Sequence, residues 1–424
     1  MNANICAPFD VLGLIGQILR AAKLPPETLM QKRHFLRTLA LACLACLACL
    51  ALTGVTQALA QDSFKIGLVL PLTGPFASTG KQIEAAARLY MAQNGATVAG
   101  KKLELIVKDD TGVPDVTKRL AQELVANEKV SVLAGFGLTP LALATAPLAT
   151  QSQTPMVVMA AATSSITQAS PFIVRSSFTV PQVVTVLADW AAKNNIKRVV
   201  SLVTDYAPGV DSEKYFKDQF EANGGTVMET LRVPLRNPDF APFLQKVRDL
   251  KPDALFTFVP SGAGSALMKQ FAERGLDKAG IRMIAEGSVT DDDILNGMGD
   301  VALGVVTAHH YSAAHNSALN KKFVEAFGKA NNGLRPNFMA VGGYDGMRVI
   351  YEAAKASKGA GGVALLNAMK GQIFESPRGP MFIDAQTRDV VHSIYIRKVE
   401  RVAGQLYNQE LETVKDVKDP GKAK

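Results

Sequence analysis

The stretch KIGLVLPLTGPFASTGKQIEAAARLYMAQN, residues 65–94, contains the two elements that decide the fold. Its first part, 65–72, is a continuous apolar run with β-branched residues, closed by Pro and Gly, which predicts a fully buried strand. Its second part, 81–94, places apolar side chains on one helical face between Ile83 and Tyr90. A buried strand followed by an amphipathic helix is the repeating unit of a parallel sheet covered by helices.

The same alternation continues along the chain and restarts once, after about Phe178. In the first block, strands and helices are predicted to alternate at 103–110, 114–128, 130–136, 140–151 and 155–160. In the second block, a helix is predicted to begin near 183. Strands are predicted at 198–205, 226–234, 253–260, 281–286 and 304–311. The helices that connect the first four of these strands are predicted at 209–225, 241–250 and 265–275. Two helices near 317–330 and 338–356, two short strands and a polar tail follow. Two successive α/β blocks of similar size predict two lobes with a cleft between them.

The early stretch LACLACLACL, residues 41–50, spaces three of the four cysteines as in an iron–sulfur ligand run. Such a run needs a fourth cysteine, but Thr53 stands in that place. The surroundings are typical of a secretory signal peptide, with a basic start at Met30, an uncharged apolar run and an A-x-A motif ending at Ala60. We expect cleavage after Ala60 and a periplasmic location; an uncleaved anchor and a lipoprotein are the alternatives.

The mature chain left by this cleavage would have no cysteine and 364 residues, enough to bury a core without disulfides. Residues 1–60 would be an N-terminal extension and signal peptide, with Met1 or Met30 as the start. Because this leader carries five basic and two acidic residues, the formal charge falls from +8 to +5. That mild and scattered charge favours a soluble surface over nucleic-acid binding.

Signatures of catalysis are sparse. The stretch SGAGSAL, 261–267, follows a predicted strand, but Leu267 stands where a dinucleotide-binding fingerprint needs its third glycine. His309 and His310 are adjacent near a strand end, where neighbouring side chains point to opposite faces, so they cannot easily share a metal. We expect no catalytic residue, no metal and no cofactor, with an exported enzyme as the alternative from another class.

Hydroxyl side chains follow two neighbouring strands of the first block. Thr139 comes after the strand 130–136 and is a plausible N-cap before Pro140, and Thr163 comes after the strand 155–160. Ligands of open α/β sheets bind at the carboxyl ends of strands, where hydroxyls and backbone N–H groups can hold a carboxylate. Plain helix capping is the structural alternative.

The second block adds an acid and an aromatic residue at equivalent places. Glu286 ends the strand 281–286, where its carboxylate could face an ammonium group across the cleft. Tyr206 follows the strand 198–205 and could pack over a ligand or donate a hydrogen bond. A surface acid and a partly buried tyrosine are the structural alternatives.

These residues resemble a known family. The stretches KIGLVLPLTGPFASTGKQIEAAARLY, LELIVKDDTGVPDVTKRLAQELV, TDYAPG and GGYDGMRVIYEAA are similar to the periplasmic binding proteins of branched-chain amino-acid ABC importers. The similarity covers roughly 63–400 in the family's order. It implies a type I periplasmic binding fold, α/β, with two Rossmann-like lobes of parallel sheet joined by three crossovers that close on the ligand by hinge motion.

The resemblance also implies where the lobes divide and which residues bind. The crossovers would lie near Phe178, Tyr311 and Asp384. The N-terminal lobe would comprise 61–178 plus 311–384, and the C-terminal lobe 179–310 plus 385–424. By position, Thr139, Ala161 and Thr163 match the loops that hold the ligand carboxylate, Glu286 matches the acid that binds the α-ammonium, and Ser78 and Thr79 match the loop beside the ligand side chain.

The chain departs from the family at two of these places. Thr79 is small and polar where an aromatic is common, and Pro208 stands where TDYAPG would often carry another tyrosine. A pocket without aromatic side chains at these two positions of its wall could admit a larger ligand, such as an aromatic carboxylate.

We therefore expect the binding component of an ABC importer, working as a monomer with an inner-membrane permease and capturing a branched-chain or other apolar amino acid. An aromatic or other organic acid is the alternative ligand, and a ligand-sensing regulator subunit is the alternative role. If Glu286 binds an ammonium group, Glu286→Gln should weaken amino-acid binding by about 1.5–3 kcal/mol.

Overall fold

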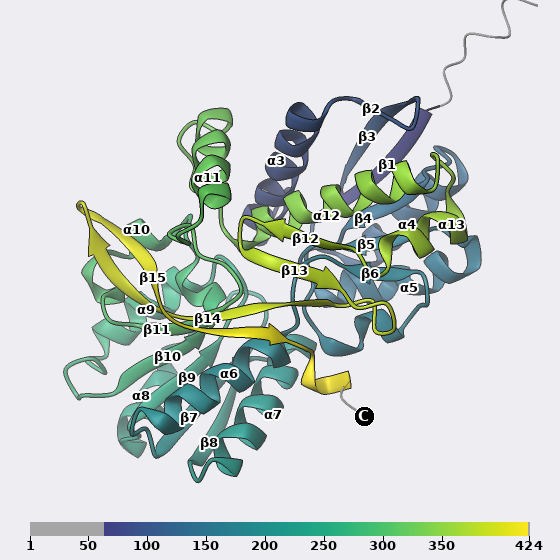
Figure 1. Cartoon of the computed structure of the whole chain (residues 1–424). Helices are drawn as coiled ribbons and strands as arrows, with labels where there is room; N and C mark the ends of the chain where they lie inside the picture. The colour runs from purple at the N-terminus through teal and green to yellow at the C-terminus, as the bar shows by residue number, and fades with distance from the viewer. Residues whose placement is uncertain (1–62, 423–424) are drawn as a thin grey trace, which may run out of the picture. The chain divides into compact units, whose positions relative to one another are not determined.

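The computed structural model describes residues 63–422, and these residues form two mixed α/β lobes, each built around one sheet (Figure 1). The first sheet has the strand order β2-β3-β1-β4-β5-β6. Its strands are β1 Ser63–Leu70, β2 Thr97–Val98, β3 Lys101–Asp109, β4 Val132–Gly135, β5 Met156–Val158 and β6 Ile173–Arg175. All pairs in it are parallel except β2 with β3.

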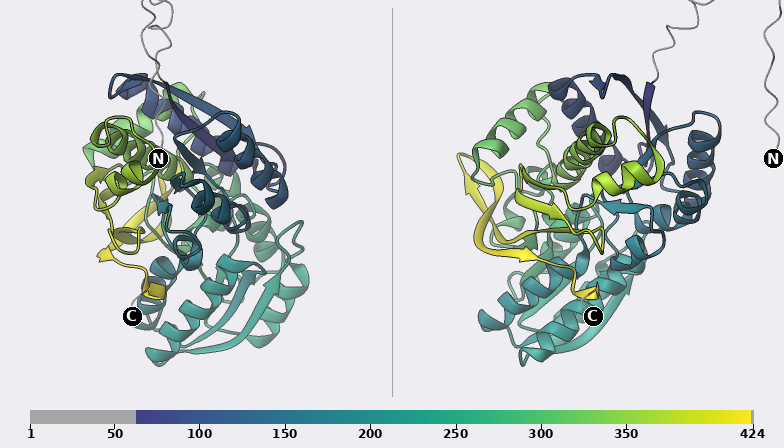
Figure 2. Two further views of the ribbon diagram at one scale, coloured as in Figure 1. Left: turned by 90° about the vertical axis from the view of Figure 1, so that its right-hand side faces the viewer. Right: turned by 45° about the vertical axis from the view of Figure 1, so that its right-hand side comes forward.

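Helices from both halves of the sequence pack around this first sheet. They are α3 Ala77–Asn94, α4 Pro114–Ala126, α5 Thr139–Ser152, α11 Ala318–Ala330, α12 Phe338–Ala356 and α13 Gly362–Met369, with the short 3-10 helix η2 at Ser164–Gln168. Although α3 and α12 are far apart in the sequence, they lie side by side in every view (Figure 2). The first lobe is therefore discontinuous in sequence.

The second sheet has the order β12-β13-β14-β11-β10-β9-β7-β8, with β15 paired to β14. Its strands are β7 Arg198–Thr204, β8 Thr226–Val233, β9 Ala254–Phe258, β10 Arg282–Glu286, β11 Val306–His309, β12 Ile373–Ser376, β13 Gly379–Ile383, β14 Val390–Val402 and β15 Gln405–Val417. Its helices are α6 Val180–Lys193, α7 Ala207–Ala222, α8 Ala241–Leu250, α9 Gly264–Glu273 and α10 Leu295–Met298, with 3-10 helices η3 Gly287–Thr290, η4 Gly299–Ala302 and η5 Pro420–Lys422. The strands β7 to β11 are parallel, whereas β12 to β15 run antiparallel to their neighbours.

The strand β7 shows why the predicted strands read as continuous apolar runs. Val199 and Val203 belong to one buried cluster, and Val200 and Leu202 belong to another on the opposite face. Because side chains alternate along a strand, a sheet covered on both faces needs apolar residues at successive positions.

Two glycines bring the loops of the first lobe close to the carboxyl end of β1. A Cβ atom at Gly80 would lie 2.3 Å from the carbonyl oxygen of Pro71, so the first turn of α3 approaches the end of β1. Gly135 ends β4 with a φ of +106°, and a Cβ atom there would lie 2.4 Å from the carbonyl oxygen of Val69. Only glycine fits such contacts. These approaches place Thr79 and the loop before α5 at the edge where the pocket forms.

The predicted fold class and the strand–helix order of both blocks are confirmed, with element bounds shifted by a few residues. The prediction of a polar tail was wrong: residues 405–417 form β15, a long strand that pairs with β14. Most of its residues are partly or fully exposed, so it lacks the apolar pattern that marks a strand. The sequence prediction also missed β6 and α13.

The predicted division between the lobes stays a prediction. Strands β12 and β13 lie in the segment 311–384, which was assigned to the N-terminal lobe, and they hydrogen-bond into the second sheet through β14. The predicted signal peptide and the predicted cleavage after Ala60 lie outside the described residues. Within residues 63–422, no helix has the length and apolar character needed to cross a membrane.

Candidate functional site

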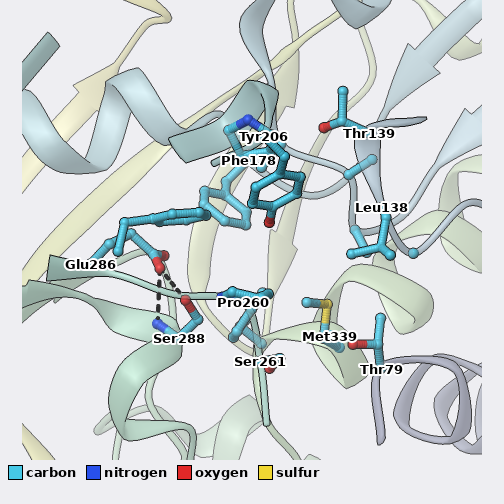
Figure 3. Close-up of a pocket in the computed structure, with 17 residues that line it drawn as sticks. Thr79, Leu138, Thr139, Phe178, Tyr206, Pro260, Ser261, Glu286, Ser288 and Met339 are labelled. Atoms are coloured by element: carbon cyan, nitrogen blue, oxygen red, sulfur yellow. Dashed lines mark hydrogen bonds between the residues drawn. The ribbon is translucent and has the colours of Figure 1, made fainter. Parts of the chain in front are cut away.

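A pocket lies between the two lobes, where loops that follow strands of both sheets meet (Figure 3). It contains about 410 Å³ of empty space, part of which opens to solvent. The lining residues follow β4, β5, β7, β9 and β10 or belong to α3, α12 and the crossover before α6: Thr79, Gly137, Leu138, Thr139, Ala160, Ala161, Ala162, Phe178, Tyr206, Pro208, Phe258, Pro260, Ser261, Glu286, Ser288, Phe338 and Met339. The site thus occupies the carboxyl ends of the parallel strands, where the sequence predicted it.

One end of the pocket, which we call the hydroxyl end, is lined by Thr139, with Thr163 directly behind it. Their Oγ1 atoms lie 2.9 Å apart and share a hydrogen bond in a buried position. The prediction that Thr139 is the N-cap of α5 was wrong: Leu138 takes that place, and no side-chain cap is made. The Thr139 hydroxyl is therefore not used by the helix. Either oxygen can be the donor of this bond; when Thr163 donates to Thr139, the Thr139 proton is free to be donated to a ligand.

A buried arginine holds the hydroxyl end from behind. Arg175 donates from Nη1 to the carbonyl oxygen of Ala161 at 3.0 Å and from Nη2 to that of Thr163 at 2.7 Å. Its Nε donates to Asp389 Oδ1 at 2.8 Å, and both side chains are almost fully buried. Burial lowers the pKa of Arg175 to about 10, so the guanidinium stays charged at neutral pH. This fixes the loop that carries Thr163.

The opposite end of the pocket, which we call the acid end, is formed by Glu286 and Ser288 (Figure 3). Glu286 is fully buried, and its Oε2 accepts a hydrogen bond from Ser288 N at 3.1 Å and also contacts Ser288 Oγ. Its Oε1 has no hydrogen-bond partner among residues 63–422. Burial raises the pKa of Glu286 to about 7, although the bonds from Ser288 and the charge of Arg397 oppose the rise.

His309 lies next to this acid without forming an ion pair. Its Nε2 is 3.6 Å from Glu286 Oε1, beyond hydrogen-bonding distance, and has no hydrogen-bond partner within the described part of the chain. Burial, together with the charges of Arg397, His392 and Arg378, holds the pKa of His309 well below its usual value. A neutral imidazole beside an acid with a pKa near 7 gives no charge pair at neutral pH.

Below the acid end, Arg397 is packed against the turn that follows β10. It donates from Nη2 to the carbonyl oxygen of Gly287 at 3.2 Å and also contacts the carbonyl oxygen of Tyr311. A Cβ atom at Gly287 would lie 2.4 Å from Arg397 Nη2, so only glycine leaves room for the guanidinium. Arg397 therefore supports the turn through its backbone.

Aromatic side chains lie between the two polar ends. Figure 3 shows the rings of Tyr206 and Phe178 between Glu286 and Thr139. Tyr206 stacks on Phe258 with ring centroids 6.0 Å apart, and Phe178 meets Phe338 edge to face at 5.6 Å. Burial raises the pKa of Tyr206 above its usual value, so its hydroxyl is protonated at neutral pH. These rings form an aromatic wall suited to a flat apolar body.

Five of the seven predicted ligand-binding residues line the pocket: Thr79, Thr139, Ala161, Tyr206 and Glu286. The backbone N–H of Ala161, predicted to hold a carboxylate, donates to the carbonyl oxygen of Phe136. Thr163 does not line the pocket but touches it through Thr139.

Ser78 was predicted to lie beside the ligand, but its side chain bonds to the other lobe instead. Its Oγ donates to Asp293 Oδ2 at 2.7 Å, and Asp293 Oδ1 also accepts from Asn337 Nδ2 at 3.0 Å. Asp293 follows η3 in the second lobe, whereas Ser78 and Asn337 lie in and beside helices α3 and α12 of the first. Ser78 thus joins the two lobes beside the pocket, and it does not line the pocket.

Sequence reasoning missed several lining residues. Phe258 ends β9, and Pro260 and Ser261 follow it, just as the predicted residues end or follow other strands, so the strand-end rule could have found them. Ser261 Oγ is buried and has no hydrogen-bond partner among the described residues, so it is free to contact a ligand. Phe338 and Met339 begin α12, and nothing in their local sequence distinguishes them from core residues. Among residues 63–422, no group of three or more His, Cys, Asp or Glu side chains is arranged to hold a metal ion.

Two α/β lobes that enclose a polar-ended aromatic pocket at their strand ends define a solute-binding protein. Residues 63–405 match the periplasmic binding protein family, so the chain belongs to that family. It is 42% identical over 365 residues, which is 85% of this chain and 94% of the other, to a protein of Brucella abortus (strain 2308) named Leu/Ile/Val-binding protein homolog 6.

Two solved structures of ABC-transporter solute-binding proteins are also similar. One, from Rhodopseudomonas palustris BisB5 in complex with 3,4-dihydroxybenzoic acid, is 61% identical with a TM-score of 0.84 and covers 85% of this chain and 100% of that chain. The other, from Rhodopseudomonas palustris HaA2 in complex with p-hydroxybenzoic acid, is 38% identical with a TM-score of 0.83 over the same shares. This chain is likewise the solute-binding component of an ABC transporter.

Proposed function

We propose that this protein captures a hydroxylated aromatic carboxylate, of the hydroxybenzoate class, for an ABC importer in the inner membrane. The observation that carries the proposal is the position of the polar groups: a spare hydroxyl proton at one end of the pocket, a free acid oxygen at the other, and aromatic rings between them. A hydroxybenzoate has a carboxylate and a hydroxyl at separate places on a flat ring, which matches this arrangement.

The electrostatics of the lining support the same ligand. The lining residues include no lysine or arginine, so a carboxylate would be held by the hydroxyl end and by the N-terminus of α5, which begins at Thr139. The relatives that are 61% and 38% identical hold 3,4-dihydroxybenzoic acid and p-hydroxybenzoic acid. Hydrogen bonds between the lobes beside the pocket, such as Ser78 to Asp293, would favour the closed arrangement around the bound ligand.

A branched-chain amino acid is the second candidate ligand, as expected from the sequence. It is favoured by the buried carboxyl of Glu286 in the lining and by the name of the relative that is 42% identical. An α-amino acid, however, carries its carboxylate and ammonium on one carbon, so it needs both partners at one end. Its ammonium also needs an ionised acid, whereas the pKa of Glu286 is raised to about 7.

The test is a thermal-shift screen of the protein purified from the periplasm, followed by calorimetry. The panel contains 3,4-dihydroxybenzoate, 4-hydroxybenzoate, benzoate, leucine, isoleucine and valine. We expect the aromatic acids to raise the melting temperature by mass action and the amino acids to leave it unchanged. Tight binding of leucine without binding of any aromatic acid would overturn the proposal.

A further inference from the structure

At the acid end, the hydroxyl of Ser288 contacts one acceptor more than its single proton can serve. Ser288 Oγ lies 2.7 Å from the carbonyl oxygen of Val259 and also contacts Glu286 Oε2. A serine hydroxyl has one proton, and a backbone carbonyl can only accept. If Ser288 donates to Val259, the contact with Glu286 is a hydrogen bond only when Glu286 itself carries a proton.

This placement uses each of the three protons at the acid end once. Ser288 N–H donates to Glu286 Oε2, Glu286 Oε2–H donates to Ser288 Oγ, and Ser288 Oγ–H donates to Val259 O. Glu286 Oε1 is then a carbonyl-type oxygen without a hydrogen-bond partner in the part of the chain that the structure describes, on a side chain that lines the pocket. A buried acceptor without a partner is costly unless a ligand supplies a donor.

We propose that Glu286 is a neutral carboxyl group that selects for a ring hydroxyl, with its Oε2 proton donated to Ser288 and its Oε1 accepting the hydroxyl proton of the ligand. This inference rests on the proposed function, since it takes the ligand to be an aromatic acid. It makes Glu286 a specificity-determining residue: the pocket favours a hydroxylated ring over an unsubstituted one and rejects an ammonium group.

The charged and titratable groups around Glu286 are consistent with a neutral acid. Arg397 on β14 contacts the backbone of the turn, and its charge favours an ionised Glu286. Opposing it is burial, which is the largest influence on Glu286. The acid Asp291, which follows η3, interacts with Glu286 through its charge, and His309 on β11 is neutral and contributes no charge. Tyr206, on the loop after β7, adds a protonated hydroxyl.

The proton can be tested without any ligand. In protein labelled with ¹³C at the glutamate side-chain carboxyl, the Glu286 signal is the one lost in Glu286→Gln. We expect it to titrate with a midpoint near pH 7, well above the ordinary value. A midpoint near that ordinary value would show an ionised Glu286 and overturn the inference.

The selection for a hydroxyl is tested by calorimetry at about pH 6 with two probes, 4-hydroxybenzoate and benzoate. We expect the wild type to prefer 4-hydroxybenzoate by about tenfold, the scale of one neutral hydrogen bond. Glu286→Leu should abolish the preference, whereas Glu286→Gln, which keeps a carbonyl oxygen, should weaken 4-hydroxybenzoate binding by less than about tenfold. Loss of more than about thirtyfold in Glu286→Gln would indicate a charged acceptor and contradict a neutral one.

The pH dependence of ligand affinity provides a second test with the same variants. Between about pH 6 and about pH 8.5, ionisation of Glu286 adds a second negative charge to the pocket that holds the ligand carboxylate. The wild-type affinity for benzoate, which has no hydroxyl to donate, should therefore fall, and that of Glu286→Gln should stay constant. The matched control is Glu410→Gln, which removes a carboxyl that pairs with His315 outside the pocket. It should behave as the wild type.

The outcomes separate the inference from the proposed function. If leucine binds and no aromatic acid does, the proposed function fails, and the ligand-free titration still reports the proton on Glu286. If aromatic acids bind but hydroxylation of the ring and Glu286→Leu change nothing, the proposed function stands and the inference fails.

Discussion

At the hydroxyl end of the pocket, Thr139 and Thr163 share one hydrogen bond and keep a proton to donate, whereas at the acid end Glu286 keeps an oxygen to accept. Each end is supported by a buried arginine, but in different ways. Arg175 is ion-paired with Asp389, while the hydrogen bonds of Arg397 go to carbonyl oxygens and the hydroxyl of Thr307.

The difference shows how one pocket can orient a ligand without using a cation. Both arginines act on the backbone of the loops and stay out of the lining, so the groups that meet the ligand are neutral donors and acceptors. A ligand with an acceptor at one end and a donor at the other fits in one orientation only. The following predictions test each end separately, beginning with the largest expected effect.

Removing the charge behind the hydroxyl end should have the largest effect. Arg175→Met breaks a buried ion pair and leaves the carbonyls of Ala161 and Thr163 without their donor. We expect the free energy of unfolding, measured with urea, to fall by about 3 kcal/mol or more. Arg198→Met, which breaks an exposed pair with Asp253, is the control and should cost less than about 1 kcal/mol. Equal costs for the two variants would contradict a supporting role for Arg175.

At the acid end, stability should depend on pH. The folded-state pKa of Glu286 is raised from 4.5 to about 7, so its protonated form stabilises the fold below about pH 4.5 and that contribution is lost as the pH rises through 7. The wild type should therefore lose up to about 3 kcal/mol relative to Glu286→Gln between about pH 4.5 and pH 8. Urea unfolding of both proteins at the two pH values measures the gap. A constant gap, or a gap of opposite sign, would rule out the raised pKa.

Removing the free donor at the hydroxyl end should weaken ligand binding rather than destabilise the fold. Thr139→Val keeps the shape of the side chain but deletes the hydroxyl, and we expect affinity for 3,4-dihydroxybenzoate to fall about tenfold by calorimetry. The matched control lies in the same helix: Thr145 donates to Leu141 O away from the pocket, so Thr145→Val should leave the affinity unchanged. If both variants bind as the wild type does, the hydroxyl end does not hold the carboxylate.

The smallest effect is expected at the contact that joins the lobes. Ser78→Ala removes the hydrogen bond to Asp293 but no lining side chain, so ligand release should accelerate by about threefold with little change in association. Stopped-flow fluorescence measures both rates. Should Ser78→Ala instead alter the preference between 4-hydroxybenzoate and benzoate, Ser78 contacts the ligand as the family resemblance implies.

Much of this architecture was predictable because a parallel sheet that is buried on both faces requires strands with continuous apolar runs. The runs at 65–72 and 198–205 therefore identified β1 and β7 within two residues. The strand β15 was not predictable in this way, since most of its side chains face solvent and its order comes from backbone bonds to β14.

The candidate site likewise contains residues that the sequence could predict and residues that it could not. Thr139, Tyr206 and Glu286 could be named because each directly follows or ends a strand, where ligands of parallel sheets bind. Phe178 and Phe338 could not be, because they come from a crossover and from the start of a late helix, and only folding brings their rings within 5.6 Å.

By itself, the sequence determined the order of strands and helices, the glycines at close backbone approaches, and the residue types at each strand end. Those features depend on local periodicity and on steric limits within a few residues. Only the tertiary structure decided which groups are partners, such as Arg175 and Asp389, which lie 214 residues apart. It also decided the proton on Glu286, because that depends on which oxygen atoms surround a buried carboxyl, and spacing along the chain does not record such contacts.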